Sequence, residues 1–214
     1  MVEIRPAATT ERESSMAPQR PRRPPKPVVL PTPLRYLESP NQSRRLFGFP
    51  YLLVAHRPVG RYGPSISWLR NPRSQASVHV ITEGRGTGVD VATQLVAWHL
   101  KAWACESFNS YSYNVEVDDD AWDGDDLGSA FTAARIFAFL GWKTGIPMEW
   151  TRKPVDVPGI CRHLDLGRAG GGHSDPTTDV VLWRWFIRQC QRERDRGDFR
   201  KSWGWGRLSK IQRR

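Results

Sequence analysis

The stretch Tyr51-Leu52-Leu53-Val54-Ala55-His56 decides the fold, because it is an uninterrupted apolar run that ends in a histidine. Pro50 precedes the run, and Pro58 and Gly60 follow it, so residues that break regular structure bound it on both sides. A short apolar run with such boundaries is typical of a buried strand. The stretch therefore predicts a buried strand with His56 at its carboxyl end.

Two further segments have the composition of strands. Residues 77–82 form an apolar segment that stops at Gly84, and residues 113–117 alternate between apolar and polar side chains. Apolar residues at helical spacing predict helices over residues 128–140 and 178–196. Strands that alternate with helices predict an α/β fold, in which a single domain has a mixed central β-sheet flanked by helices.

The net charge of +10 is unevenly distributed along the 214 residues. Residues 1–45 carry nine Lys and Arg against four acidic residues, and residues 184–214 carry eleven against three. Residues 46–183 carry twelve against fifteen. The basic ends favour polyanions such as nucleic acid, anionic lipid or the anionic polymers of a cell wall, and charge alone does not choose among them.

The chain is expected to divide into three parts. Residues 1–45 contain nine prolines and predict a disordered Pro/Arg-rich arm, because such a segment buries too little apolar surface to offset its ordering entropy. Residues 46–197 are expected to form the folded domain, and residues 198–214 a basic Trp/Gly tail. Within the domain, the acidic run over residues 118–126 predicts a solvated loop.

The three cysteines, Cys105, Cys161 and Cys190, are odd in number and follow no spacing pattern, so we expect buried thiols and no disulfide framework. No stretch approaches the roughly 18–20 apolar residues of a membrane span. The N-terminal sequence MVEIRPAATTERESS lacks the apolar core of a signal peptide. We therefore expect a protein made in the cytoplasm, which needs a separate route of release if its substrate lies outside.

Histidines beside turns are the best candidates for chemistry. His56 ends the first strand, His163 precedes the glycine-rich residues 167–172, and His173 and Asp175 follow them. A glycine-rich loop lets the chain double back, so that donors on both sides of it reach one ion. A catalytic zinc site uses three such nitrogen and oxygen ligands and keeps one position open. Spacing alone leaves ordinary loop histidines as the alternative.

Four motifs occur in order between residues 47 and 186. They are Leu52-Leu53-Val54-Ala55-His56; Trp68-Leu69-Arg70-Asn71-Pro72 with Ala76-Ser77-Val78-His79-Val80-Ile81; Asn109-Ser110-Tyr111-Ser112-Tyr113-Asn114-Val115-Glu116; and Gly145-Ile146-Pro147 with Pro158-Gly159-Ile160-Cys161-Arg162-His163 and Gly172-His173-Ser174-Asp175-Pro176. Together they resemble the type-2 amidase family, which includes bacteriophage amidase endolysins, bacterial anhydromuropeptide amidases and peptidoglycan recognition proteins.

The resemblance implies zinc-dependent hydrolysis of the amide bond between N-acetylmuramic acid and L-alanine in peptidoglycan. It places His56, His163 and Asp175 at the positions of the zinc ligands. Glu116 falls at the position of the general base, and His173 at that of the residue that stabilises the oxyanion. These roles agree with chemistry, because amide hydrolysis at neutral pH needs an activated water and a stabilised oxyanion.

His79 and His99 are expected to orient a ligand or to face the substrate. The chain also departs from the family: Val78 stands where some members have an aromatic hydroxyl, and Asn114 stands where glycine is frequent. These departures leave open a module that binds peptidoglycan without cutting it. The basic ends leave open a polyanion- or nucleic-acid-binding protein, and in an amidase they would favour anionic wall polymers as further partners.

The sequence leaves the biological setting open between a phage lysis enzyme released by a separate pore, a virion component and a host enzyme.

Overall fold

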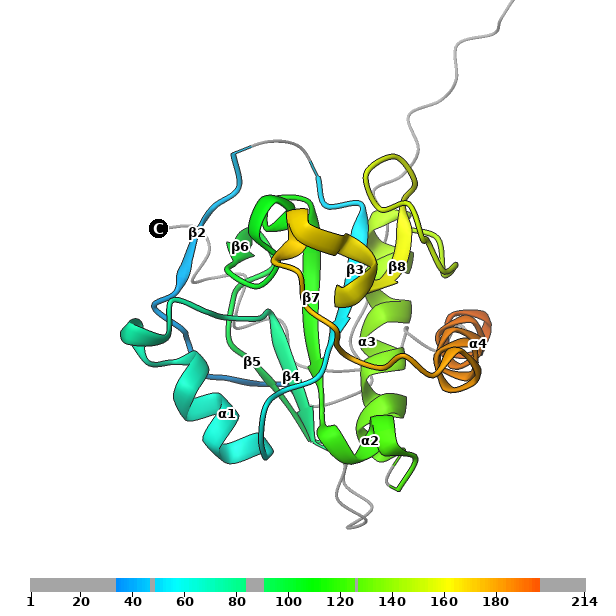
Figure 1. Cartoon of the computed structure of the whole chain (residues 1–214), viewed down its shortest axis with the longest axis horizontal. Coiled ribbons are helices and arrows are strands. Elements are labelled where there is room, and N and C mark those ends of the chain that lie inside the picture. The colour runs from blue at the N-terminus through cyan, green and yellow to red at the C-terminus, as the bar shows by residue number, and fades with distance from the viewer. Residues whose placement is uncertain (1–33, 47–48, 84–90, 126, 197–214) are drawn as a thin grey trace, which may run out of the picture.

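The computed structural model describes residues 34–46, 49–83, 91–125 and 127–196, which form a central sheet with helices on its faces (Figure 1). The six strands lie in the order β1-β5-β4-β7-β3-β8, and every neighbouring pair is parallel except β4 and β5. These strands are β1 (Leu34–Tyr36), β3 (Leu52–His56), β4 (Val80–Glu83), β5 (Val91–Gln94), β7 (Ser112–Val117) and β8 (Gly159–Arg162). The predicted α/β fold with a mixed central sheet is confirmed.

The helices cover both faces of this sheet. They are α1 (Tyr62–Leu69), α2 (Asp119–Asp123), α3 (Gly128–Thr144) and α4 (Val180–Arg196), with short 3-10 turns η1 (Pro72–Ser74), η2 (Glu106–Phe108) and η3 (His163–Gly170). Helix α3 packs against β4, β5 and β7, and α4 packs on the outside of α3 (Figure 1). Helix α1 contacts β4. A separate two-stranded sheet joins β2 (Gln42–Arg44) to β6 (Leu100–Ala102).

Strand β3 contributes to the core on both of its faces. Leu53 and Ala55 belong to the large apolar cluster around α3, whereas Leu52 and Val54 belong to a smaller cluster on the opposite face. Successive side chains of a strand point to opposite faces of the sheet. His56 therefore shares the face of Leu52 and Val54, away from α3.

The predicted strands at residues 51–56, 77–82 and 113–117 correspond to β3, β4 and β7, and the two predicted helices to α3 and α4. The prediction of a loop over residues 118–126 is wrong for Asp119–Asp123, which form α2. The Asp118 side chain accepts a hydrogen bond from the Asp119 N–H, and acidic residues in the first turn are favoured by the helix dipole.

The expectation of a disordered arm over residues 1–45 is wrong for its last part. Strand β1 pairs in parallel with β5, and β2 pairs antiparallel with β6. The backbone hydrogen bonds that order these short strands come from partners far along the chain, so local composition does not reveal them. Residues 1–33 and the predicted tail over residues 198–214 lie outside the described residues.

The three cysteines are all buried and unpaired, as expected from their number and spacing. None of the helices within the described residues has the length and hydropathy of a segment that crosses a bilayer.

Two phenylalanines of α3 provide a matched test of the core. Phe137 is fully buried and packs edge-on against Phe186 of α4, whereas Phe131 is 36% exposed. Phe137→Ala should lower the free energy of unfolding by about 3–5 kcal/mol, because it removes a large side chain and leaves a cavity. Phe131→Ala should cost only about 1 kcal/mol. Urea denaturation of both variants measures the difference, and equal losses would contradict this account of the core.

Candidate metal centre

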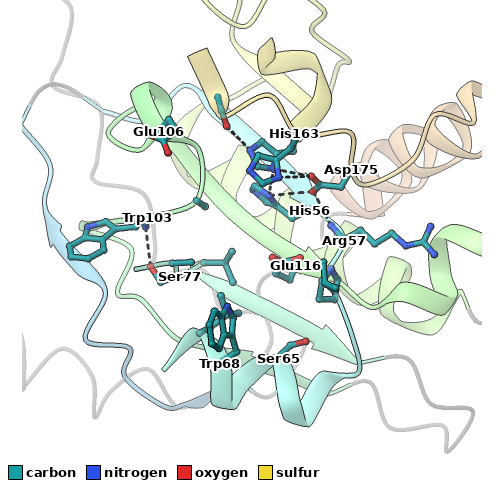
Figure 2. A pocket seen from close by; sticks show the side chains of 18 of the residues that line it. His56, Arg57, Ser65, Trp68, Ser77, Trp103, Glu106, Glu116, His163 and Asp175 are labelled. Carbon is teal, nitrogen blue, oxygen red and sulfur yellow. Dashed lines mark hydrogen bonds and ion pairs between the residues drawn. The ribbon is translucent and has the colours of Figure 1, made fainter. Parts of the chain in front are cut away.

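Three side chains converge at the carboxyl ends of neighbouring strands. His56 ends β3, His163 directly follows β8, and Asp175 follows the glycine-rich segment (Figure 2). The Nδ1 atoms of the two histidines lie 3.1 Å apart. Asp175 Oδ1 lies 3.1 Å from His163 Nδ1, and Asp175 Oδ2 lies 3.6 Å from His56 Nδ1. The three residues that the sequence predicts as zinc ligands therefore form one cluster.

The other ring nitrogens of these histidines face oxygen acceptors. His163 Nε2 lies 2.8 Å from the Gly170 carbonyl oxygen, and His56 Nε2 lies 3.0 Å from Asn114 Oδ1. An oxygen acceptor requires an N–H at each Nε2, which leaves a lone pair on each Nδ1 of the neutral rings. Two lone pairs and a carboxylate converge, and such a cluster needs a positive charge between them, either a proton or a metal ion.

The spacing of these donor atoms fits zinc. With zinc–ligand bonds of about 2.0–2.1 Å, the corners of a tetrahedron are about 3.3 Å apart. The measured separations of 3.1, 3.1 and 3.6 Å lie on either side of that value. Two neutral imidazoles and one carboxylate would leave an ion at net charge +1, with a fourth position for a reacting group.

Cys105 offers a competing ligand, because His56, Cys105 and His163 also lie close enough together to hold an ion. However, Cys105 Sγ lies 3.6 Å from His56 Nε2, whereas Asp175 approaches Nδ1 of the same ring. Burial raises the pKa of the Cys105 thiol well above its ordinary value, and the thiol donates a hydrogen bond to Asn114 Oδ1 at 2.9 Å. Because the Nδ1 atoms of both histidines face Asp175, the geometry favours Asp175 over Cys105 as the third ligand.

The glycine-rich loop holds Asp175 in place. Gly171 and Gly172 have φ angles of 103° and 72°, which allow the chain to double back as the sequence predicts. The Arg57 N–H donates to Asp175 Oδ2 at 3.2 Å, and the Asp175 carbonyl oxygen accepts from the Leu164 N–H at 2.9 Å. Burial favours the protonated carboxyl, but in the metal-free protein the hydrogen bond from His163 and the positive charge of a proton held by His163 and His56 outweigh it and lower the pKa of Asp175 to about 2.

Glu116 lies beside His56, since the two residues are register partners in the parallel pair of β7 and β3. Its Oε2 atom is buried and has no hydrogen-bond partner among the described residues. Burial, and then repulsion from Asp175, raises the pKa of Glu116 to about 8. A carboxyl group with a raised pKa in a pocket is a candidate for proton transfer.

The cluster opens into a pocket of about 1200 Å³. His56, Glu116, His163 and Asp175 line one part of it, and Trp68 and Trp103 line the side away from these histidines (Figure 2). His173 also lines the pocket. The Trp68 side chain is 58% exposed although it is large and apolar. The pocket therefore combines a buried ionisable cluster with an open aromatic side, and no sequence pattern predicted this aromatic side.

The remaining predicted residues lie at different depths. The His173 ring stacks on His163 with centroids 4.1 Å apart, and its side chain is 57% exposed. His79 is fully buried, and burial followed by repulsion from Arg45 lowers its pKa to about 3. It does not line the pocket and reaches the cluster through Asn114, whose N–H donates to His79 Nδ1 at 3.0 Å. His99 is exposed and does not line the pocket.

No role for Asn114 followed from the sequence, although its side chain contacts the predicted ligand His56. The signal was available: Asn114 and Glu116 are two residues apart on one strand, so both point to the same face.

The chain is similar to known proteins in sequence and in structure. No protein-family model matches the chain. The chain is 30% identical over 82 residues to N-acetylmuramoyl-L-alanine amidase A of Achromobacter lyticus, a match that covers 38% of this chain and 45% of that amidase. The match thus spans less than half of the curated relative.

Solved structures share the fold. The hydrolase AmiA of Staphylococcus aureus, in complex with its ligand, has a TM-score of 0.63 at 16% identity, over 76% of this chain and 84% of AmiA. The PlyG catalytic domain has a TM-score of 0.58 at 18% identity, over 76% of this chain and 96% of that domain. The sequence match confirms the resemblance to an amidase that the motifs indicate, and the solved structures confirm the fold.

The raised pKa of Glu116 predicts how stability changes with pH in the metal-free protein. The folded state keeps this proton up to about pH 8, whereas the unfolded chain loses it near the ordinary value of 4.5. Because the native state binds more protons, this residue lowers the free energy of unfolding as pH rises between those values. Glu116→Gln should therefore be less sensitive to pH over this range and more stable than the wild type at pH 8.

Urea denaturation with a chelator present, at pH 5 and pH 8, measures this effect. Glu106→Gln is the matched control, since Glu106 is an exposed carboxylate at the same pocket. An unchanged pH dependence in Glu116→Gln would show that Glu116 is ionised in the folded protein.

Proposed function

We propose that the chain is a zinc-dependent N-acetylmuramoyl-L-alanine amidase of the type-2 family. The reaction is hydrolysis of the amide bond between N-acetylmuramic acid and L-alanine in peptidoglycan. The observation that carries this proposal is the convergence of His56 Nδ1, His163 Nδ1 and the Asp175 carboxylate beside Glu116. The 30% identity to a curated amidase supports the substrate class.

His56, His163 and Asp175 would hold the ion. Zinc in this site would supply a Lewis acid for the scissile carbonyl and would lower the pKa of a water to about 7. The protein must then provide two further functions, a group that moves protons and a group that stabilises negative charge on the carbonyl oxygen.

Glu116 is the proposed general base. Its raised pKa of about 8 in the metal-free protein means that the carboxyl holds its proton near neutrality, and a neighbouring cation would favour the ionised form. A base with a pKa near the working pH accepts a proton from the attacking water and returns it to the leaving amine. Its Oε2 atom has no hydrogen-bond partner among the described residues, so this atom is free to carry the transferred proton.

His173 is the proposed donor to the oxyanion. Its side chain is exposed on the pocket side, while stacking on His163 fixes the plane of the ring. Its Nδ1 lies 3.7 Å from Asp175 Oδ1, so the ring lies directly beside the proposed ion site. Removing a donor of this kind costs on the order of 3–4 kcal/mol of transition-state stabilisation.

The aromatic side of the pocket suits a saccharide. Trp68 and Trp103 offer flat apolar surfaces against which the face of a sugar ring can pack, across the pocket from the proposed ion site. A volume of about 1200 Å³ accommodates a sugar together with part of its peptide.

The basic ends of the chain support a further partner. We propose that the excess of Lys and Arg in residues 1–45 and 184–214 attracts the protein to the anionic polymers of a cell wall. In this setting the enzyme acts on the wall in lysis or remodelling.

His163→Ala tests the ion site. The wild type should carry about one zinc per chain and release L-alanine amino termini from muramyl peptide. The variant should lose the zinc and at least about 100-fold in activity, because two ligands cannot hold a catalytic ion. Metal analysis by mass spectrometry and an amino-group assay measure both, and His99→Ala is the matched control at an exposed histidine. Zinc without cleavage in the wild type would instead favour a peptidoglycan-binding module.

Glu116→Gln tests the base separately from the ion. The amide side chain cannot accept the proton, so kcat should fall about 100- to 10,000-fold while the zinc content stays at the wild-type level. Loss of zinc in this variant would mean that Glu116 acts as a ligand, and retained activity would assign the base elsewhere.

A further inference from the structure

Asn114 is a fully buried residue of β7 on the same sheet face as His56 and Glu116. Its Oδ1 atom lies 3.0 Å from His56 Nε2 and accepts from Cys105 Sγ at 2.9 Å. Its Nδ2 group donates to Ser112 Oγ at 3.0 Å. One amide side chain thus connects a proposed metal ligand to two other buried groups.

The hydrogen-bond network fixes which end of the amide faces His56. Ser112 Oγ donates its own hydrogen to the Phe108 carbonyl oxygen at 2.9 Å, so it accepts from the NH₂ group of Asn114. Ser112 therefore places the carbonyl oxygen of Asn114 on the side of His56, where the Cys105 thiol can donate to it.

The backbone of Asn114 is held as firmly as its side chain. Its N–H donates to His79 Nδ1 at 3.0 Å, and its carbonyl oxygen accepts from the His79 backbone N–H at 2.9 Å. Arg45 donates to the carbonyl oxygens of Ser110 and Ser112 at 2.8 and 3.1 Å, which fixes the start of the same strand. Asn114 therefore cannot follow a rotation of the His56 ring.

We propose that Asn114 is a positioning residue for the metal centre: its Oδ1 holds the proton of His56 on Nε2 and thereby keeps the Nδ1 lone pair directed at the ion. The presence of an ion at this site rests on the proposed function, whereas the tautomer of His56 is a property of the metal-free protein. At the position where glycine is frequent in the family that the chain resembles, this chain has Asn114, whose side chain contacts the proposed ligand His56.

The expected effect follows from what a neutral imidazole can do. Without an acceptor at Nε2, the buried ring keeps an unpaired N–H there or moves its proton to Nδ1, where it can bond to Asp175. The Nδ1–H tautomer cannot bind the ion through that atom. Loss of the hydrogen-bond partner of a ligating histidine typically weakens metal binding about 10- to 100-fold.

The tautomer of His56 in the chelator-treated protein is the first test. Long-range ¹H–¹⁵N NMR spectra should show the Nε2–H form in the wild type and in Asn114→Asp, which keeps the acceptor. Asn114→Leu, of similar volume, should shift His56 towards the Nδ1–H form. If Asn114→Leu does not fold, Asn114→Gly removes the acceptor without adding bulk. A wild-type Nδ1–H form, or an unchanged tautomer in the folded variants without an acceptor, overturns the proposal.

The dissociation constant of zinc, measured by chelator competition on folded protein, is the second test. Asn114→Leu or Asn114→Gly should bind zinc about 10- to 100-fold more weakly, and Asn114→Asp at least as tightly as the wild type. Asn41→Leu is the matched control, because Asn41 is another buried asparagine whose side chain bonds to Asn71 and Ala76 outside the cluster. An equal loss in Asn41→Leu would mean that general damage to the core explains the effect.

Cys105→Ala separates this role from metal ligation by the thiol. The variant removes the second donor to Asn114 Oδ1 but keeps the His56 contact, so zinc affinity should be retained. A loss equal to that of Asn114→Leu would make Cys105 a ligand through His56 Nε2 and would overturn the proposal. Absence of zinc binding in the wild type would reject the proposed zinc chemistry, while the tautomer measurement still decides the role of Asn114.

Discussion

The parallel pairing of β3 between β7 and β8 is the constraint on which the site depends. Because the three strands run in the same direction, their carboxyl ends meet at one end of the sheet, where His56 is in register with Glu116 and His163 begins the next segment. The alternation of side chains then turns His56, Asn114 and Glu116 to the face opposite α3. A slip of β3 by one residue would turn His56 into the apolar core, and a slip of β7 would do the same to Asn114 and Glu116.

Burial gives this cluster its electrostatic character. Water is largely excluded, so burial, and then repulsion from His163, lowers the pKa of His56, while burial and the Asp175 charge raise that of Glu116. Two groups thus favour their neutral forms beside a carboxylate that stays ionised. A divalent cation would compensate this arrangement, and because it would bind the folded chain only, it would also stabilise the fold by mass action.

Sequence patterns were sufficient to predict the strands and helices whose formation depends on local periodicity. The apolar run of β3, the alternation in β7 and the helical stripes of α3 and α4 all predicted elements that the structure contains. They were insufficient for β1 and β2, which are short strands ordered by distant partners. They also missed α2, where a helix dipole and a capping Asp118 stabilise acidic residues that otherwise indicate a loop.

The sequence by itself determined the α/β class, the strand that ends in His56, the glycine-rich turn and the four motifs that resemble type-2 amidases. Only the tertiary structure decided which atoms of these residues face each other: Asp175 approaches His56 Nδ1, Cys105 lies beside Nε2, and His99 stays outside the pocket. It also decided that Asn114 faces His56 and that Trp68 and Trp103 line the same cavity. The physical reason is that hydrogen bonds, desolvation and ligand geometry act over a few ångströms. The residues that they join here are more than a hundred positions apart in the chain, so local sequence patterns do not reveal these contacts.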